Sequence, residues 1–262
     1  MVNQAFQPQR FTTEGFGIHL TLELDSQLDI SGLNQACPPG QAWLPCSETK
    51  ADFWIRPGRG HWLLGHRNKV LYQASQHELP DVLRREVHAY IATHSPSHLF
   101  IHAAAVQLPH CLLVLPARTY SGKSTLTKAF LDLGYPVLSD EFCVIQESRV
   151  YPFPRELLLR DPDQAIKLPP PPPYCDLPPA IFSLKYQKDE PGLAVQPISA
   201  GQAVMALIDN CVSARHLTSE RLGWLAHFCQ KGVAFSGTRG DAALTTQLII
   251  DKTKSEEKWK TH

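Results

Sequence analysis

The chain has 262 residues, of which 43% are hydrophobic and 19% are charged, enough for one large domain or a core domain with a small appendage. Its 25 basic and 25 acidic residues balance to a formal net charge of +0, so no basic field predicts nucleic-acid binding. No apolar run reaches the roughly 20 residues of a membrane span, the start lacks a signal pattern, and seven scattered cysteines without C-x-x-C indicate reduced thiols, so we expect a cytoplasmic protein that binds no nucleic acid and no membrane.

Short strands are predicted in the N-terminal part, residues 1–78. Apolar and polar residues alternate from Phe16 to Leu24, which is typical of a half-buried strand. Shorter strands are expected at 52–56, 61–65 and 69–73, because turn residues separate them, and residues 31–50 are expected to be a loop. We expect a small antiparallel sheet that either extends the core sheet or docks a substrate or partner.

A helix and two strands are predicted next. Asp81 is expected as the N-cap of a helix that ends at Ser95-Pro96, because Leu83, Val87 and Ile91 share one face. A strand of small apolar residues follows at 99–106 and contains His102. A histidine in such a strand is either a hydrogen-bonded core group or a site residue.

A phosphate-binding loop is predicted at residues 117–125, which read A-R-T-Y-S-G-K-S-T. It follows an apolar strand at 111–115 and precedes a helix at 126–133 that Gly134 ends. In this context the amide groups and the dipole of the helix N-terminus bind an anion. Lys123 is expected to reach the outer phosphates, and the Ser124 hydroxyl is expected to ligate Mg²⁺.

Several loop residues are expected to contact a nucleotide, with Arg155 contributing from outside the loop. These residues are Thr119, Tyr120, Ser121, Gly122, Lys123, Ser124, Thr125 and Arg155. Arg118 is a further phosphate candidate. Ala117 stands where the motif usually opens with glycine, which costs little if its φ is negative and more if it is positive.

Two acidic residues follow the next predicted strand, at 136–139. A carboxylate at this place can hold magnesium or accept a proton from an attacking hydroxyl, or it can cap a helix or turn. We expect Asp140 to serve as base and metal ligand, with Glu141 as a second candidate metal ligand. Arg155 either neutralises phosphate charge or pairs with a surface carboxylate.

The C-terminal part, residues 161–262, shows no second motif that carries chemistry. The proline run at 169–173 predicts extended chain that either borders the site or connects elements on the surface. A strand is expected at 181–186 and another at 233–237. Helices are expected after a capping box at Ser199, after Ser219 and after Asp241.

The order of His102, the G-K-S loop and Asp140 resembles the catalytic core of HPr kinase/phosphorylase, a family of PEP carboxykinase-like P-loop kinases. The segments I-H-A-A-A-V, S-G-K-S-T and L-S-D-E carry the likeness over about residues 99–146. The resemblance implies that Lys123 holds the β and γ phosphates and that Asp140 is the catalytic base. It also implies that His102 is a catalytic residue that tunes the charge of Asp140.

The chain departs from this family at three places. Ala117 replaces the first glycine, Glu141 stands where the family has a second aspartate, and the segment L-E-I-R-G-L-G is not recognisable. The Y-P-F-P-R stretch at 151–155 is similar instead to shorter HPr-kinase-related proteins found beside peptide-tailoring genes, including lasso peptide kinases. The resemblance therefore implies a peptide or protein acceptor other than HPr. The related bifunctional kinases are hexamers, so a homo-oligomer is a candidate assembly.

The sequence thus predicts an α/β fold, with a P-loop kinase core of the PEP carboxykinase/HPr kinase type at 79–262 and an N-terminal antiparallel β extension at 1–78. The expected function is transfer of the γ-phosphate of ATP, with Mg²⁺, to a serine hydroxyl of a peptide or protein. Two alternatives stay open. One is a kinase that acts on a free amino acid or sugar alcohol, and the other is a non-catalytic nucleotide-binding module that regulates a partner, which Ala117 favours.

Overall fold

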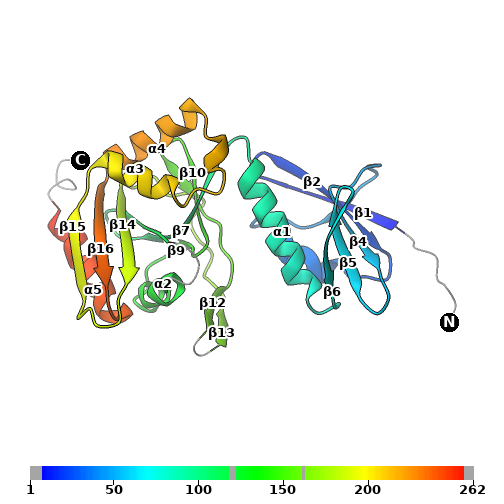
Figure 1. The fold of residues 1–262 in the computed structure, drawn as a ribbon, viewed down its shortest axis with the longest axis horizontal. Coiled ribbons are helices and arrows are strands. Elements are labelled where there is room, and N and C mark those ends of the chain that lie inside the picture. Colours follow the sequence, from blue (N-terminus) through cyan, green and yellow to red (C-terminus); the bar gives the residue numbers. More distant parts are fainter. Residues whose placement is uncertain (1–7, 118–121, 161–162, 257–262) are drawn as a thin grey trace. The chain divides into compact units, whose positions relative to one another are not determined.

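The computed structural model describes residues 8–117, 122–160 and 163–256, which form a mixed α/β fold. The chain divides into two compact units, of which the first ends at Ser97 and the second begins at His98. Figure 1 shows the elements of each unit. The predicted domain boundary at residue 78 lies before α1, earlier than the division that the contacts show. None of the helices in the described ranges has the length and apolar character needed to span a bilayer.

The N-terminal unit contains, within its described residues, a six-stranded sheet in the order β3-β1-β2-β4-β5-β6. Its strands are β1 (Pro8–Gly15), β2 (Ile18–Asp25), β3 (Leu44–Pro45), β4 (Phe53–Pro57), β5 (Trp62–His66) and β6 (Lys69–Ala74). β2 and β4 pair in parallel, so the expected antiparallel extension is wrong in this respect. A parallel pair needs a long crossover, and the connection containing the 3-10 helix η1 (Ile30–Ala36) supplies it.

The hairpin between β1 and β2 turns at Phe16 and Gly17. Both residues have positive φ, 54° and 75°, as a two-residue hairpin turn of the mirror-image type requires. Phe16 therefore lies in the turn and not at the start of the strand, where the sequence analysis placed it. β1, which was not predicted, pairs with β2 along its whole length.

Helix α1 (Leu79–His94) belongs to the N-terminal unit. Its buried face, which includes Leu83, Val87 and Ile91, packs on η1, β5 and β6. The helix therefore covers the N-terminal sheet, which explains why the units divide after it. The N-cap is Glu78 and not Asp81, which lies in the first turn and accepts a hydrogen bond from Nη2 of Arg84 at 2.9 Å.

The C-terminal unit is built on a second sheet, which in the described residues has the order β11-β10-β7-β8-β14-β16-β15, with β9 paired to β7. Its strands are β7 (Leu99–Gln107), β8 (Leu112–Pro116), β9 (Val137–Ser139), β10 (Phe142–Gln146), β11 (Arg149–Tyr151), β14 (Pro179–Tyr186), β15 (Leu193–Pro197) and β16 (Val233–Arg239). β12 (Leu157–Arg160) and β13 (Asp163–Ile166) form a separate hairpin. β14 runs parallel to both β8 and β16, so the carboxyl ends of these three strands share one edge.

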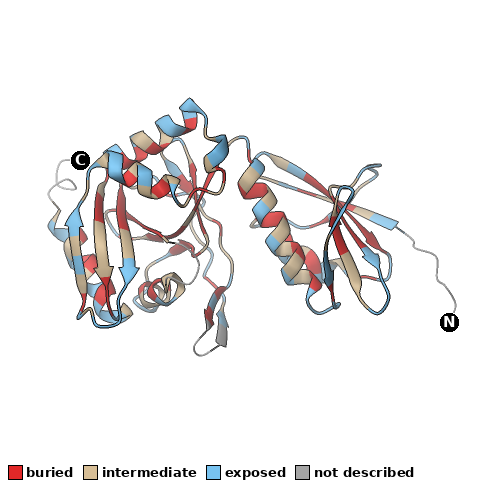
Figure 2. Ribbon diagram, viewed as in Figure 1, coloured by how far each residue is buried: buried red, intermediate tan, exposed pale blue. Residues whose placement is uncertain are grey.

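Helices cover both faces of this sheet (Figure 1). α2 (Lys123–Asp132) and α5 (Ala242–Ser255) pack on one face through residues such as Phe130 and Ile249. α3 (Ala200–Ile208) and α4 (Ser219–Lys231) pack on the other face through residues such as Leu207 and Phe228. A short 3-10 helix, η2 (Ala214–His216), lies between α3 and α4 in the chain. Because both faces are covered, the central strands are apolar on both sides and are mostly red in Figure 2.

The predicted helix caps of this unit are largely confirmed. Ser199 and Gln202 form a capping box at the start of α3, and Asp241 accepts hydrogen bonds from two amide groups at the start of α5. The cap of α4 is Thr218, one residue before the expected Ser219. Either hydroxyl can serve this position chemically, so only the backbone conformation distinguishes them.

A close contact in the N-terminal sheet gives a test of this packing. The Trp54 ring lies so close to Gly65 that a Cβ at Gly65 would come within 2.0 Å of Cζ2 of Trp54. The indole N–H donates to the Arg67 carbonyl at 2.7 Å, which holds the ring in place. We expect Gly65→Ala to lower the free energy of unfolding by about 1–3 kcal/mol, the usual cost of overpacking, as measured by chemical denaturation.

The matched control is Gly32→Ala in η1, where a Cβ would meet no atom within 4 Å. This substitution should change the free energy of unfolding by no more than about 0.5 kcal/mol. Equal effects of the two substitutions would contradict the packing of Trp54 on Gly65.

Candidate functional site

The predicted phosphate-binding loop lies at the carboxyl edge of β8, between Pro116 and the start of α2 at Lys123. This edge is where open α/β sheets bind ligands. Arg118, Thr119, Tyr120 and Ser121, which were expected to contact phosphate, lie outside the described residues. The structure describes the two ends of the loop, Ala117 and Gly122.

The backbone at both ends suits the residues that occupy them. Gly122 is the N-cap of α2 and has φ 74° and ψ 19°, a left-handed conformation that favours glycine. Among described residues, the non-glycine positions with positive φ are Phe16, Arg67 and Glu147, so Ala117 does not need a conformation that disfavours alanine. The amide of Ala117 donates to the His102 carbonyl at 3.1 Å, which joins the loop entrance to β7.

The Asp140 carboxylate is the buried centre of the site, with 2% of its surface exposed. Its Oδ2 accepts a hydrogen bond from Oγ of Ser124 at 2.6 Å, and its Oδ1 lies 2.8 Å from Oγ1 of Thr127. Thr127 Oγ1 also lies 3.0 Å from the Lys123 carbonyl, and its single hydrogen serves one acceptor at a time. Asp140 directly follows β9, so these hydrogen bonds connect the end of β9 to the first turns of α2.

A tight turn sets the direction of the Asp140 side chain. The buried Ser139 Oγ accepts hydrogen bonds from the amides of Glu141 at 3.0 Å and Phe142 at 2.9 Å. This hydroxyl fixes the backbone that links β9 to β10. The carboxylates of Asp140 and Glu141 are therefore presented from one rigid turn, as the sequence analysis expected for a strand end.

Lys123 lies in the first turn of α2 among charged groups of both signs. Burial lowers the pKa of Lys123, and the positive charge of Arg155 adds to this effect, whereas the carboxylates of Asp140 and Glu141 oppose it. A lysine whose charge is disfavoured in this way gains from a nearby anion. The position and the surroundings of Lys123 therefore agree with phosphate binding.

His102 is half-buried on β7, with its ring centroid 4.9 Å from that of Phe142. Burial lowers the pKa of His102, the charges of Lys123 and Arg155 lower it further, and a hydrogen bond with the backbone of Glu141 opposes them. The groups that act on the ring are thus the two cations and Glu141. The hydrogen bonds of the Asp140 carboxylate come from Ser124 and Thr127, and the expected effect of His102 on the charge of Asp140 stays a prediction.

Glu141 and Arg155 form an ion pair, with Nη1 to Oε2 at 2.7 Å and both side chains 24% exposed. Of the two open interpretations for Arg155, the pair with a carboxylate is therefore present. The Arg155 Nε has no hydrogen-bond partner among the described residues, so the guanidinium retains a donor. Thr125, another expected contact, lies exposed on α2.

The residues present fit a magnesium ion that is shared with phosphates. Mg²⁺ in such sites takes one or two protein oxygens and completes its shell with waters and phosphate oxygens, and Ser124 Oγ lies 2.6 Å from Asp140 Oδ2. The described residues contain no cluster of three or more His, Cys, Asp or Glu that would hold a metal alone. Ser124 and Asp140 would hold the ion, and Glu141 would first have to leave Arg155.

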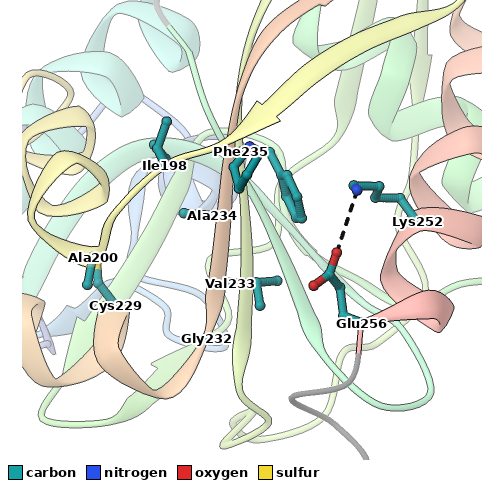
Figure 3. Close-up of a pocket in the computed structure, with 10 residues that line it drawn as sticks. Ile198, Ala200, Cys229, Gly232, Val233, Ala234, Phe235, Lys252 and Glu256 are labelled. Carbon is teal, nitrogen blue, oxygen red and sulfur yellow. Dashed lines mark ion pairs between the residues drawn. The ribbon is translucent and has the colours of Figure 1, made fainter.

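A separate cavity of about 320 Å³ lies at the opposite edge of the sheet, around the first residues of β16 (Figure 3). Ile198, Val233 and Phe235 line it, together with the ion pair between Lys252 and Glu256, whose Nζ and Oε1 atoms are 3.7 Å apart. Of the described residues at the candidate site, Ala117, Gly122 and Asp140 do not border this cavity. It is therefore not part of the candidate site.

Two residues at the site were not found from the sequence. Ser124 precedes Thr127 by three positions, so the two side chains share a helix face. This spacing could have indicated that Thr127 also reaches the site. Arg239 at the end of β16 donates from Nη2 to the Gly122 carbonyl at 2.8 Å. Nothing in the local sequence around Arg239 indicates this long-range contact.

The surroundings of His102 predict a pH dependence of stability. Because its pKa in the folded protein is below the ordinary value of 6.5, its contribution is fully present above pH 6.5 and is lost as the pH falls through the lowered value. We expect His102→Gln to lose less free energy of unfolding than the wild type between about pH 7.5 and about pH 5. Urea denaturation at each pH measures this difference.

The control is His216→Gln, which changes an exposed histidine of η2 in the same unit. This variant should follow the wild type across the pH range. If His102→Gln loses as much stability in acid as the wild type does, the assigned surroundings of His102 are wrong.

Two comparisons with known proteins found no match to this chain. A scan against models of protein families found no match to the chain, and a search of curated proteins found no relative. The function proposed below therefore rests on the geometry of Gly122, α2 and the residues after β9, and on the resemblance of the three motifs.

Proposed function

We propose that the C-terminal unit is a P-loop kinase of the PEP carboxykinase/HPr kinase type. It binds ATP at the loop between β8 and α2 and transfers the γ-phosphate to a hydroxyl. The acceptor is a serine of a peptide or protein, as the likeness of the Y-P-F-P-R stretch to peptide-tailoring kinases suggests. The single observation that carries the proposal is the contact of Ser124 with Asp140 next to Lys123.

The contact of Ser124 with Asp140 supports phosphoryl transfer, because it joins a carboxylate to the helix turn that carries Lys123. This reaction is catalysed mainly by positioning and by stabilising charge on the transferred group. α2 provides free amide groups at its N-terminus for the phosphates, and Lys123 stands on its first turn. Asp140 reaches the same turn from β9, so nucleotide contacts and a carboxylate converge.

Lys123 and Arg155 supply the positive charge on the side of the outer phosphates. Both cations act on the same neighbour, because each lowers the pKa of His102. Magnesium, when bound by Ser124 and Asp140, neutralises charge on the phosphate oxygens. Arg155, which keeps its Nε–H donor, can turn from Glu141 to the transferred group.

Asp140 accepts the proton of the acceptor hydroxyl in this proposal. To do so, one of its oxygens must leave its present hydroxyl donor. Oδ2 is the better candidate, because Ser124 would release it if the Ser124 hydroxyl held magnesium, whereas Thr127 would still hold Oδ1. The lowered pKa of His102 disfavours a positive charge there that would weaken Asp140 as a base.

One observation favours a second candidate function, a nucleotide-binding module without catalysis. Both oxygens of Asp140 are already engaged by hydroxyl groups, as expected of a carboxylate that only anchors a helix. Such a protein would bind ATP tightly and phosphorylate no acceptor. A transfer assay with radiolabelled ATP, serine peptides, free serine and sugar alcohols separates the two functions and also identifies the acceptor class.

Lys123→Met removes a half-buried charge next to Arg155 and the positive end of α2, so the protein without nucleotide should gain about 2–4 °C in Tm. The same change should weaken ATP binding at least about tenfold, or 1.4 kcal/mol, and abolish transfer. Calorimetry and the radiolabel assay measure these effects.

Lys128→Met is the matched control, because Lys128 lies on the same helix and pairs with Asp132 on the surface. It should leave ATP binding and transfer unchanged. Transfer at the wild-type rate by Lys123→Met would rule out the proposed mechanism.

Substitution of Asp140 by asparagine separates ATP binding from phosphate transfer. Asn keeps the shape of Asp, and its amide group can donate to the hydroxyl of Ser124 or Thr127, so Asp140→Asn should fold. We expect it to bind ATP within about threefold of the wild type and to lose at least about a hundredfold in transfer rate. Unchanged transfer would remove Asp140 from the role of base.

A further inference from the structure

We propose that Arg239 is a positioning residue of the phosphate-binding loop, which holds the Gly122 carbonyl so that the first amides of α2 face a bound polyphosphate. This inference rests on the proposed nucleotide site and adds to it a residue that the motif does not contain. It is carried by hydrogen bonds and packing of described residues at the carboxyl edge of the C-terminal sheet.

The strand order brings Arg239 to the loop from far along the chain. Ile181 of β14 pairs with Val114 of β8, and β8 ends soon afterwards at Pro116. β14 continues to Tyr186, which pairs with Arg239 of β16. Because these two strands extend past the end of β8, the Arg239 side chain stands next to the loop that follows Pro116.

The guanidinium of Arg239 joins two carbonyl groups. Nη2 donates to the Gly122 carbonyl at 2.8 Å and Nη1 donates to the Gly240 carbonyl at 3.0 Å. Its central carbon lies 5.1 Å from the centroid of the Tyr186 ring, and only 4% of the residue is exposed. A planar fork with several fixed donors suits this bridging role better than a lysine ammonium does.

The contact with the Gly122 carbonyl also sets the direction of the Lys123 N–H, because the two groups belong to one planar peptide bond. In a trans peptide the carbonyl of Gly122 and the N–H of Lys123 point in opposite directions. The carbonyl is held by Arg239 and also by the amide of Leu126 at 3.2 Å, on the helix side. The Lys123 N–H therefore points out of the helix N-terminus, where an anion binds.

The backbone of Arg239 is itself held rigidly. The Arg239 carbonyl accepts from the amide of Gln187 at 2.9 Å, and the amide of Gly240 donates to Gly192 at 2.7 Å. A Cβ at Gly240 would lie 1.9 Å from the Glu190 carbonyl oxygen, so this turn fits closely around the strand end. The Arg239 side chain therefore extends from a backbone held by hydrogen bonds and holds the Gly122 carbonyl.

Gly122 has a second reason to be glycine. A Cβ at this position would lie 2.4 Å from Nη2 of Arg239, in addition to the strain that its positive φ would cause. Any side chain here would push the guanidinium away from the carbonyl. The glycine of the G-K-S triplet and Arg239 therefore depend on each other.

Burial lowers the pKa of Arg239 while Tyr186 and the Asp241 carboxylate oppose this effect, and a bound anion would favour the charge further. A cation near the N-terminus of a helix opposes the helix dipole, and Lys123 adds a second cation at the same end of α2. A neutral donor could hold the Gly122 carbonyl without this repulsion. A bound polyphosphate would remove the repulsion, so an arginine here serves both geometry and anion binding.

The test compares the affinity for ATP and for inorganic tripolyphosphate in four full-length proteins by titration calorimetry. These are the wild type, Arg239→Met, Arg239→Lys and the control Arg221→Met, which removes a buried arginine from α4 on the other face of the sheet. We expect Arg239→Met to bind both anions at least tenfold more weakly, and Arg221→Met to bind them within twofold of the wild type. Arg239→Lys keeps the charge but cannot span both carbonyls, so it should bind severalfold more weakly.

The outcomes separate this inference from the proposed function. If Arg239→Met binds both anions with wild-type affinity and still transfers phosphate, the inference alone is overturned. Wild-type affinity in Arg239→Lys would overturn it too, and this variant is the test to use if Arg239→Met does not fold. Loss of tripolyphosphate binding in the Arg239 variants supports the inference even if no acceptor is ever phosphorylated, a result that would overturn only the kinase proposal. Binding of neither anion by the wild type would overturn both.

Discussion

The hydrogen bonds from Ser124 and Thr127 to Asp140 are the interactions on which the candidate site depends. A carboxylate that is 2% exposed must have donors, and these two hydroxyls lie on one face of α2. They fix the first turns of the helix against the end of β9. The direction of the helix N-terminus, and with it the end of the loop, follows from this one buried group.

The charges at this edge of the sheet favour an anion near the N-terminus of α2. Lys123, Arg155 and Arg239 approach the N-terminal end of α2 or the residues around it. The carboxylates of Asp140 and Glu141 favour the charge of Lys123, and that of Asp241 favours the charge of Arg239. Burial and like charges make this region less stable than a neutral one would be. Sites that bind phosphate commonly retain such a cost, because the anion removes it when it binds.

Much of the C-terminal unit could be predicted because its elements have strong local signals. Apolar runs indicated β7, β8 and β14, and Ser199 and Asp241 marked the starts of α3 and α5. The N-terminal sheet was predicted less well. Its β2–β4 pair is parallel and its strand β1 was missed, because pairing direction depends on how a long connection folds and not on residue alternation. The caps of α1 and α4 were displaced, since neighbouring polar residues offer equivalent caps and the backbone selects one.

The sequence by itself determined the local chemistry of the site, namely a G-K-S triplet between an apolar strand and a helix and two acids after the next strand. These features are local because a helix N-terminus and a strand end are each built from consecutive residues. Only the tertiary structure decided that Asp140 binds Ser124 and Thr127, that Glu141 pairs with Arg155, and that Arg239 reaches Gly122 across 117 positions of the chain. Such contacts depend on the order, register and relative length of the strands, which are set by packing of the whole sheet against its helices.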